Sequence, residues 1–440
     1  MTTIDPEPLL PMLRRIAANL LGGGVPPPVA LARQRVEAPR LDDVERAVES
    51  EVARAIAGRR PGPIAVGVGS RGIANLELIV RSTVRALRAA GWEPFVVPAM
   101  GSHGAATAEG QAEVLAGFGV TEDRIGAPVR ATMETVVIGE AGGIPVHMDR
   151  FAFAAGAVFL IARVKPHTSF RGPIESGPAK MCAIGLGKQP GAQLMHDAGG
   201  AGLRERIPLA ARLAYERGFL AGALAIVENQ RDQTALVRGL HGDEVGGLPE
   251  SDLLARARAL LPRIPFDQVD VLVVDRMGKD ISGTGIDTNV INRFRIVGQE
   301  ESGTPMVTTI AVMDLSAGSH GNAMGIGLVD YIPARLLARI DLEALYTNVI
   351  TGGQIAIERP HLPMVMADDR DAIRAAIVAC GRPAAEVRLA WIHDTLHTEL
   401  LGVSPALLKE AEGREDLEVA RGLEPMPFGQ DGELEPLYLD

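Results

Sequence analysis

The chain is short of cysteine, of positive charge and of long apolar runs. Only two cysteines, Cys182 and Cys380, occur in 440 residues. This excludes a disulfide framework and a CxxC metal knuckle, and it favours a reducing compartment. Lysine and arginine number 44 against 55 aspartates and glutamates, which gives a formal charge of −11. Such a chain lacks the positive field with which proteins bind nucleic acids or anionic membranes.

The apolar runs are too short to cross a bilayer. The longest, residues 151–162, lies between two arginines and falls well short of the about twenty residues that a membrane helix needs. The N-terminal segment carries acids where a secretory signal carries positive charge. We therefore expect a cytoplasmic protein with no membrane partner. With 47% hydrophobic and 22% charged residues, the composition is that of an ordinary globular chain with more than one domain.

Strand and helix patterns alternate along most of the chain. Short apolar runs bounded by proline or glycine predict strands, and apolar residues at helical spacing predict helices between them. Strands separated by helices indicate an α/β protein with mostly parallel sheets flanked by helices. The strands are expected at 63–66, 94–97, 135–138, 158–164, 223–227, 269–274, 306–312 and 387–391, and the helices at 43–57, 76–87, 334–340 and 371–379.

A proline-containing break at residues 261–265 divides this pattern. We therefore expect two α/β domains, residues 1–265 and 266–440, with an active site in the cleft between them. Asn75 is expected to cap the helix that starts at residue 76, and Gly91 to end it. The acidic tail from Gly413 is expected to dock as a surface segment.

A glycine-rich segment, Gly67-Val68-Gly69-Ser70-Arg71-Gly72, joins a predicted strand to a predicted helix. A dinucleotide fingerprint has this position, because its glycines let a phosphate approach the backbone at a helix N-terminus. The next strand ends in Pro98-Ala99-Met100-Gly101 without the acid that would hold a ribose. The segment therefore favours a phosphate or carboxylate site, or a turn without a ligand, over an NAD site. Arg71 can clamp a carboxylate with two hydrogen bonds.

Three of the nine histidines lie in turns rich in small residues. His103 and His167 each follow a predicted strand, where α/β sheets place ligand sites, and His196 lies downstream. Lys180 stands among small and apolar residues, where an unpaired ammonium loses its proton and becomes nucleophilic. The alternatives are histidines with structural roles in turns, and a Lys180 that reaches the surface or pairs with Glu175.

Other histidines carry weaker signals. His393 and His397 are four residues apart, as in helical zinc sites, but they follow a strand-like run and lack the glutamate of the HExxH motif. His320, in a glycine-rich turn, either lines the cleft or is a turn histidine. A GxSxG elbow is absent from the sequence, which disfavours an α/β-hydrolase.

These residues resemble the nickel-dependent lactate racemase family. The resemblance covers nearly the whole chain and is strongest from Gly67 to His196, in the blocks GVGSRGIANL, VVPAMGSHGAATAEGQ, RVKPHTSFRGPIESGPAKMCAIGLGK and GAQLMH. In that family the cofactor is a nickel-pincer nucleotide, a pyridinium mononucleotide whose ring carbon and two sulfurs grip nickel. The resemblance implies that Lys180 tethers this cofactor covalently, that His196 ligates the nickel, and that His103 and His167 act as catalytic acid and base.

The resemblance also implies further contacts. Ser70 and Arg71 match the family turn that holds the cofactor and the substrate carboxylate. Asp287-Thr288-Asn289, followed by Asn292 and Arg295, looks like the family's substrate-holding helix, so Asn292 and Arg295 are expected to bind substrate. Lys-Pro-His at residues 165–167 and Gly-Ser-Arg-Gly at 69–72 replace the family's Glu-Pro-His and Thr-Arg-Pro. These departures indicate a divergent branch.

The implied reaction is the inversion of a 2-hydroxy acid by a racemase or epimerase. Its C–H bond is barely acidic, and a positioned base alone supplies only roughly 10²–10⁴-fold. A cofactor that accepts hydride avoids the carbanion, because loss of a proton and a hydride leaves a planar 2-keto acid. The two enantiomers need a base on different sides, which accounts for two histidines.

The implied partners are a small 2-hydroxy acid and the enzymes that build the cofactor, with neither nucleic acid nor membrane; a homo-oligomer stays open. Two other functions are compatible with the residues. One is a nicotinamide-dependent oxidoreductase that uses the GVGSRG turn. The other is a non-catalytic protein that binds a nucleotide or a carboxylate.

Overall fold

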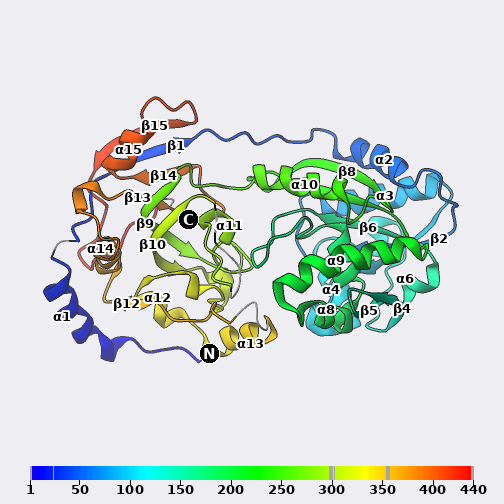
Figure 1. Cartoon of the computed structure of the whole chain (residues 1–440), viewed down its shortest axis with the longest axis horizontal. Helices are drawn as coiled ribbons and strands as arrows, with labels where there is room; N and C mark the ends of the chain where they lie inside the picture. The colour runs from blue at the N-terminus through cyan, green and yellow to red at the C-terminus, as the bar shows by residue number, and fades with distance from the viewer. Residues whose placement is uncertain (1, 23, 297–300, 302, 353–356, 438–440) are drawn as a thin grey trace. The chain divides into compact units, whose positions relative to one another are not determined.

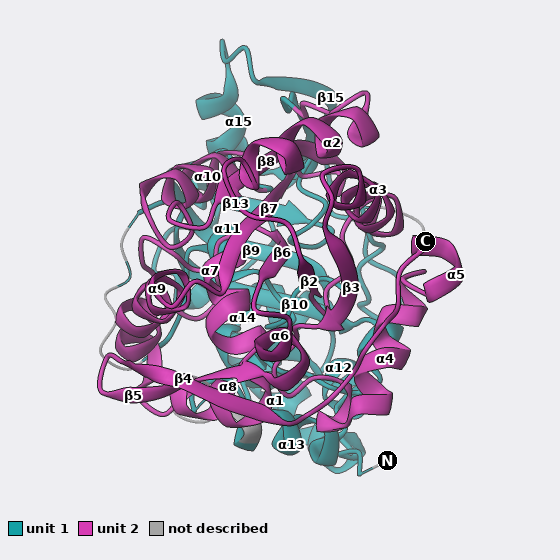
Figure 2. Ribbon diagram, turned by 90° about the vertical axis from the view of Figure 1, so that its right-hand side faces the viewer, with its two compact units in different colours: residues 1–37, 262–440 teal, residues 38–261 magenta. Residues whose placement is uncertain are grey.

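The computed structural model describes residues 2–22, 24–296, 301, 303–352 and 357–437, and it divides into two compact units (Figures 1 and 2). Unit 1 is made of residues 1–37 and 262–440, and unit 2 of residues 38–261. The boundary at 261 lies close to the expected one at 265. Residues 1–37, expected in the first domain, belong with the C-terminal unit instead. The reason is that the strand Val29–Gln34 (β1) pairs antiparallel with Leu400–Val403 (β14) and Leu417–Glu424 (β15).

Both units are α/β, as predicted. Unit 2 is built on a five-stranded sheet in which only the last strand is antiparallel to its neighbour. Its strands carry nearly continuous apolar runs because helices cover the sheet, and side chains such as Val66, Val96 and Phe159 have no exposed surface. The strands lie in the order Glu93–Pro98 (β3), Pro63–Val68 (β2), Val158–Arg163 (β6), Leu220–Glu228 (β7) and Thr234–His241 (β8).

Apolar residues at helical spacing make the helices of unit 2 amphipathic. The helix Leu76–Ala89 (α3) buries Leu76, Ile79 and Val84 as expected, and Gly91 follows its end in the left-handed conformation. Asn75 was expected to cap α3, but it adopts the left-handed conformation and its side chain makes no cap hydrogen bond. The other helices are Val44–Ala55 (α2), Ala108–Gly117 (α4), Glu122–Ile125 (α5), Arg150–Ala155 (α6), Pro178–Lys180 (α7), Lys188–His196 (α8), Gly199–Glu216 (α9) and Leu248–Ala259 (α10), with a π-helical turn at Met181–Gly185 and a hairpin of Thr135–Ala141 (β4) and Ile144–Asp149 (β5).

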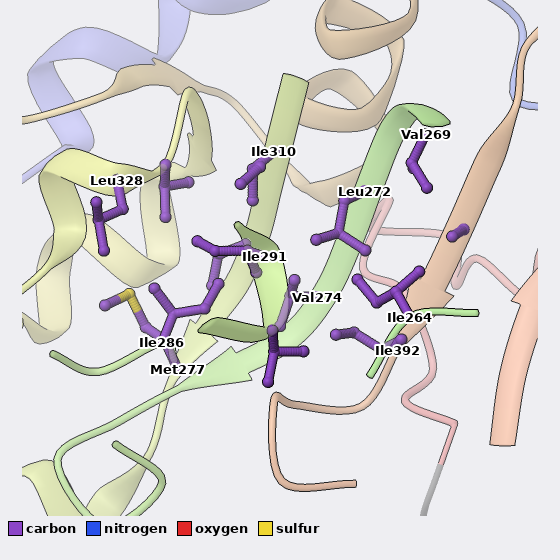
Figure 3. Close-up of a cluster of buried hydrophobic side chains, with 14 of the residues drawn as sticks. Ile264, Val269, Leu272, Val274, Met277, Ile286, Ile291, Ile310, Leu328 and Ile392 are labelled. Atoms are coloured by element: carbon purple, nitrogen blue, oxygen red, sulfur yellow. The ribbon is translucent and has the colours of Figure 1, made fainter. Parts of the chain in front are cut away.

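Unit 1 is built on an eight-stranded sheet. Its first five strands are parallel to their neighbours, and β14, β1 and β15 continue the sheet antiparallel. Figure 3 shows the core on one face, where Leu272, Val274, Ile310 and Ile392 from three strands belong to one buried cluster with Ile291. The strands lie in the order Met364–Met366 (β12), Tyr331–Pro333 (β11), Met306–Leu315 (β10), Gln268–Met277 (β9), Leu389–Ile392 (β13), β14, β1 and β15.

The helices of unit 1 include those expected near residues 334–340 and 371–379. The tail from Gly413 contributes β15, an edge strand whose residues after Leu417 are exposed, so it is more ordered than a docked surface segment. Among the described helices, none combines the length and the apolar character that a membrane span requires. The helices are Leu10–Leu20 (α1), Thr288–Ile291 (α11), Ala334–Arg339 (α12), Leu342–Gly352 (α13), Asp369–Ala379 (α14) and Pro405–Ala411 (α15).

Candidate functional site

Four of the predicted site residues of unit 2 follow the carboxyl ends of three neighbouring strands. Ser70 and Arg71 come after β2, His103 after β3 and His167 after β6, and β2 lies between the other two strands. Because β2, β3 and β6 are parallel, their carboxyl ends share one edge of the sheet, which is where α/β proteins bind ligands. The topology therefore gathers residues that are up to 97 positions apart in the sequence.

Ser70 and His103 are in direct contact. The Ser70 hydroxyl and the His103 Nδ1 atom form a short hydrogen bond. A hydroxyl can donate or accept, so this contact is compatible with either state of Nδ1. The loop that carries His103 is fixed by Gln111 on α4, whose side-chain amide donates to the carbonyl oxygens of Gly101 at 2.8 Å and His103 at 3.2 Å.

Sequence reasoning missed the residue that anchors this loop, Lys188. Its Nζ atom donates to Gln111 Oε1 at 2.9 Å and to the Pro98 carbonyl oxygen, and it lies 3.0 Å from Asp149 Oδ2. The side chains of Lys188 and Asp149 have no exposed surface. Burial lowers the pKa of Lys188, while the Asp149 carboxylate acts in the opposite direction. Lys188, like Lys180, stands in a run of glycines and small residues. This was the signal in the sequence that could have identified Lys188 as a buried lysine.

The loop that carries His167 is held by a buried carboxylate. Glu175 has no exposed side-chain surface and accepts hydrogen bonds from the main-chain N–H of His167 at 2.9 Å and of Gly172 at 3.0 Å. Arg258 on α10 donates to the same carboxylate at 2.9 Å, and Arg171 lies 3.6 Å from it. In the described part of the chain Lys180 forms no ion pair with Glu175, so the alternative of a direct pair between them is wrong.

Lys180, at the end of α7, lies in an environment that disfavours its charge. Its Nζ atom is 5.9 Å from the centre of the Phe170 ring. Desolvation and the positive charge of Arg71 lower the pKa of Lys180 to about 7, although Glu175 acts in the opposite direction. With such a pKa, about half of the side chains carry a neutral, nucleophilic amine at neutral pH. An amine in this state can act as a nucleophile near neutral pH.

His196, at the end of α8, is held in one tautomer. Its Nδ1–H donates to the Ala192 carbonyl oxygen at 2.6 Å, so the lone pair of the neutral ring is on Nε2. This is the arrangement of a metal-binding histidine whose other nitrogen is fixed by the protein. Desolvation of the packed part of the ring and the charge of Lys180 lower the pKa of His196.

Arg71 contributes positive charge without a matching acid. Among the described residues, no aspartate or glutamate pairs with its guanidinium. Its side chain reaches solvent, but desolvation of its packed part and the charge of Arg163 lower its pKa. Arg163 is itself paired with Glu228. The Arg71 guanidinium, coupled to Lys180, therefore favours the binding of an anion such as a carboxylate or a phosphate.

The glycine-rich turn serves packing, and its helix end is already capped. A Cβ atom on Gly67 would lie 2.8 Å from the Leu160 side chain, and one on Gly69 would lie 2.8 Å from Met181. The main-chain N–H of Ala74, just before α3, donates to Glu228 Oε1 at 2.6 Å. A carboxylate of the chain thus stands where a dinucleotide fingerprint binds pyrophosphate, which weighs against the nicotinamide alternative.

Asn292 and Arg295 lie in unit 1, just after the four-residue helix α11. Arg295 Nη2 lies 2.7 Å from Asp330 Oδ1, and Arg293 Nη1 lies 2.6 Å from Oδ2 of the same carboxylate. Asp287 caps α11 by accepting from the main-chain N–H of Asn289 at 2.9 Å. Arg295 therefore shares the carboxylate of Asp330 with Arg293 inside unit 1. Substrate binding by Asn292 and Arg295 stays a prediction.

Two histidines of unit 1, His393 and His397, lie beside aspartates. His393 Nδ1 lies 3.1 Å from Asp275 Oδ2, and His397 Nδ1 lies 2.8 Å from Asp394 Oδ1. Within the described residues no three histidine, cysteine or acidic side chains form a group that could hold a metal ion. His320 occupies a left-handed position at the end of a short 3₁₀ turn.

Comparisons with solved structures find partial likenesses. The lactate racemase apoprotein from Thermoanaerobacterium thermosaccharolyticum matches with a TM-score of 0.44 and 12% sequence identity, over 83% of this chain and 85% of that one. A crystal structure of a protein from Thermotoga maritima matches with a TM-score of 0.44 and 14% identity, over 82% of this chain and 89% of that one. No protein-family model and no curated protein sequence matches the chain. At this similarity the matches do not indicate a reaction.

Proposed function

We propose that the protein is a racemase or epimerase of 2-hydroxy acids that uses a lysine-tethered nickel-pincer nucleotide. One observation carries the proposal. A lysine with a pKa of about 7, Lys180, is coupled electrostatically to both His196, whose Nε2 lone pair is available to a metal, and Arg71, which has no acidic partner in the described residues. Ser70 follows the end of β2, and His103 follows the end of the adjacent strand β3.

The residues present suit this cofactor chemically. Covalent attachment needs a neutral amine, which Lys180 supplies near pH 7. Imidazole is a good ligand for nickel, so one histidine nitrogen would complement the donors that the cofactor brings. His196 is the residue that would supply this nitrogen. Arg71 would bind a phosphate of the nucleotide or the carboxylate of the substrate.

When bound, the cofactor supplies a hydride acceptor, and with it a route through a 2-keto acid. The chain's own residues hold and orient the substrate and move its hydroxyl proton. Arg71 would fix the carboxylate by two hydrogen bonds, which orients the carbon to be inverted. His103, in contact with Ser70, would take the proton from the hydroxyl and return it. His167 is the second imidazole at the same edge of the sheet.

To test the proposal, the chain is produced together with the enzymes that make the cofactor. Production takes place in the cytoplasm of the host, because the proposal makes the protein a cytoplasmic one. Nickel per chain, the mass of the peptide that contains Lys180, and inversion of a panel of 2-hydroxy acids by chiral chromatography are then measured. We expect stoichiometric nickel, a mass increment on Lys180 and inversion of at least one acid. Inversion by a chain with unmodified Lys180 would contradict the tether. A chain with nickel and adduct that oxidises substrates without inverting them would contradict the racemase.

A further inference from the structure

The turn that carries His103 has a backbone conformation that side chains disfavour. Gly104, Ala105 and Ala106 follow one another with φ angles of 66°, 55° and 54°. Glycine adopts this left-handed region freely, but in alanine the Cβ atom crowds the following carbonyl oxygen. Such conformations persist where the surrounding structure holds them. His103 and Ala105 are exposed, so the support must come from contacts made by the backbone of the turn.

The backbone of the turn lies directly on the first turn of α4. A Cβ atom on Gly104 would lie 2.6 Å from the main-chain nitrogen of Gln111, and one on Gly110 would lie 2.2 Å from the Gly104 carbonyl oxygen. A side chain at either position would therefore force the two backbones apart. Thr107 fixes the start of α4, since its hydroxyl oxygen accepts from the main-chain N–H of Gly110 at 3.0 Å. This close contact brings the Gln111 side chain within reach of the turn.

The Gln111 side chain is fully buried, and a cation orients its amide. The Lys188 ammonium, which can only donate, lies 2.9 Å from Gln111 Oε1, so the amide oxygen must face it. The NH₂ group is then the part that reaches the turn, where it donates to the carbonyl oxygens of Gly101 at 2.8 Å and His103 at 3.2 Å. The Asp149 carboxylate, 3.0 Å from Lys188 Nζ, favours the charged form of the ammonium. Three buried side chains thus end in two hydrogen bonds to the backbone of the turn.

We propose that Gln111 is a positioning residue for His103. Its two amide hydrogens, oriented by Lys188, hold the left-handed turn in place, and the turn sets the position of the imidazole. The proposal rests on the proposed function for the use of that imidazole. Gln111 itself is buried and acts through the backbone of the turn. Without its NH₂ group, the carbonyl oxygens of Gly101 and His103 lose these donors, and the turn relaxes towards ordinary φ angles.

Hydrogen exchange in the apoprotein measures the hold on the turn without cofactor or substrate. Gln111→Glu keeps an oxygen for Lys188 but has no NH₂ group, whereas Gln111→Met has neither. Exchange is followed by mass spectrometry at pH 8 in peptides that cover residues 101–107, where the main-chain N–H groups of Gly101, Ala106 and Thr107 are hydrogen-bonded. We expect both variants to exchange about tenfold faster there. Peptides from β7 and β8 should exchange as in the wild type.

Gln430→Glu, at an exposed position of unit 1, is the control for the substitution itself and should exchange as the wild type does. Wild-type exchange of residues 101–107 in Gln111→Glu would overturn the proposal, because the side-chain oxygen alone would then suffice. Faster exchange throughout unit 2 would also overturn it, since Gln111 would then contribute only to general stability. If Gln111→Glu does not fold, Gln111→Asn replaces it with the same expectation, because its amide is one methylene too short to reach both Lys188 and the turn.

The same variants test the role of Gln111 in the cofactor-loaded enzyme. We expect Gln111→Glu to lower kcat by about tenfold to a hundredfold, because a small misplacement of a reacting group has an effect of this size, and to leave KM within about twofold. KM is retained because the turn of Arg71, which would bind the carboxylate, is unchanged. A wild-type kcat in a variant with faster exchange would overturn the positioning role. If the loaded wild-type chain inverts no 2-hydroxy acid, the proposed function fails, and hydrogen exchange still decides whether Gln111 holds the turn.

Discussion

Lys188 and Asp149 form an ion pair in which the Nζ and Oδ2 atoms are 3.0 Å apart and neither side chain is exposed. The pair joins the start of α8 to the start of α6, where Asp149 Oδ1 accepts from the main-chain N–H of Phe151 at 2.8 Å. Through Gln111 the same ammonium reaches the loop of His103. Two segments that carry predicted site residues, α8 with His196 and the loop with His103, therefore share one buried charge.

Replacing Lys188 by methionine is expected to destabilise the protein strongly. The change leaves the Asp149 carboxylate buried without its partner, a situation that costs about 3–5 kcal/mol of unfolding free energy. Urea unfolding of the apoprotein, followed by circular dichroism, measures this loss. Lys409→Met on the exposed end of α15 is the control, with an expected change within about 0.5 kcal/mol. Similar values for the two variants would show that the buried pair contributes little.

Several strands were predictable because most of their side chains are buried. The mostly apolar runs at residues 63–66, 94–97 and 269–274 lie within β2, β3 and β9, and the run at 158–164 extends one residue past β6. The strand β1 was not predicted, since its partners β14 and β15 lie more than 360 residues away. Pairing at that distance leaves no local pattern, which also explains the assignment of residues 1–37 to the wrong unit.

The residues of the candidate site also differ in whether the sequence could predict them. Ser70, Arg71, His103 and His167 could be found because each directly follows a predicted strand, and strand order then brings them together. The supporting residues could not be found in this way. Lys188 contacts Gln111 from 77 positions away, and Glu250 contacts Ala179 from 71 positions away. Their roles depend on burial and on partners that only the tertiary structure defines.

Lys180 is expected to react with amine-acylating reagents at an unusually low pH. Its pKa of about 7 predicts that its labelling in the apoprotein rises through pH 7 and levels off above it, whereas labelling of an ordinary lysine continues to rise towards its pKa near 10.4. Quantitative peptide mass spectrometry across pH 5–10 measures both. Arg71→Gln removes a positive charge and should move the Lys180 curve to higher pH. A curve unaffected by Arg71→Gln would contradict the coupling between these two residues.

Glu250 makes the stability of unit 2 depend on pH. Burial raises its pKa to about 7, although its carboxylate accepts from the main-chain N–H of Gly246 and Ala179. Between its unfolded pKa near 4.3 and about 7, the folded state binds more protons than the unfolded state, so this group lowers stability as pH rises through that window. Glu250→Gln should therefore gain stability relative to wild type between pH 4 and 7, on the order of 3 kcal/mol. Urea unfolding at several pH values tests this, and a pH-independent difference would contradict it.

Arg71→Lys keeps a positive charge but loses the fork of two parallel donors. In the loaded enzyme kcat/KM should fall by about tenfold or more, because a hydrogen bond to a charged group contributes about 1.5–3 kcal/mol. Initial rates for both enantiomers measure the fall. Arg81→Lys is the matched control, since Arg81 lies on the exposed side of α3 and pairs with Glu77. An Arg71→Lys enzyme as active as this control would move the anion site elsewhere.

The proposed metal and proton roles separate in two histidine variants. His196→Ala should lose nickel but keep the mass increment on Lys180, because the covalent bond and the metal bond are made by different residues. His103→Ala should keep both nickel and the increment and lose inversion, because it removes only the group that takes the hydroxyl proton. Nickel per chain, peptide mass and chiral turnover, measured on the same preparations, decide the assignment. If His103→Ala loses nickel, or if His196→Ala retains both nickel and turnover, the two roles are assigned to the wrong residues even though the chain inverts its substrate.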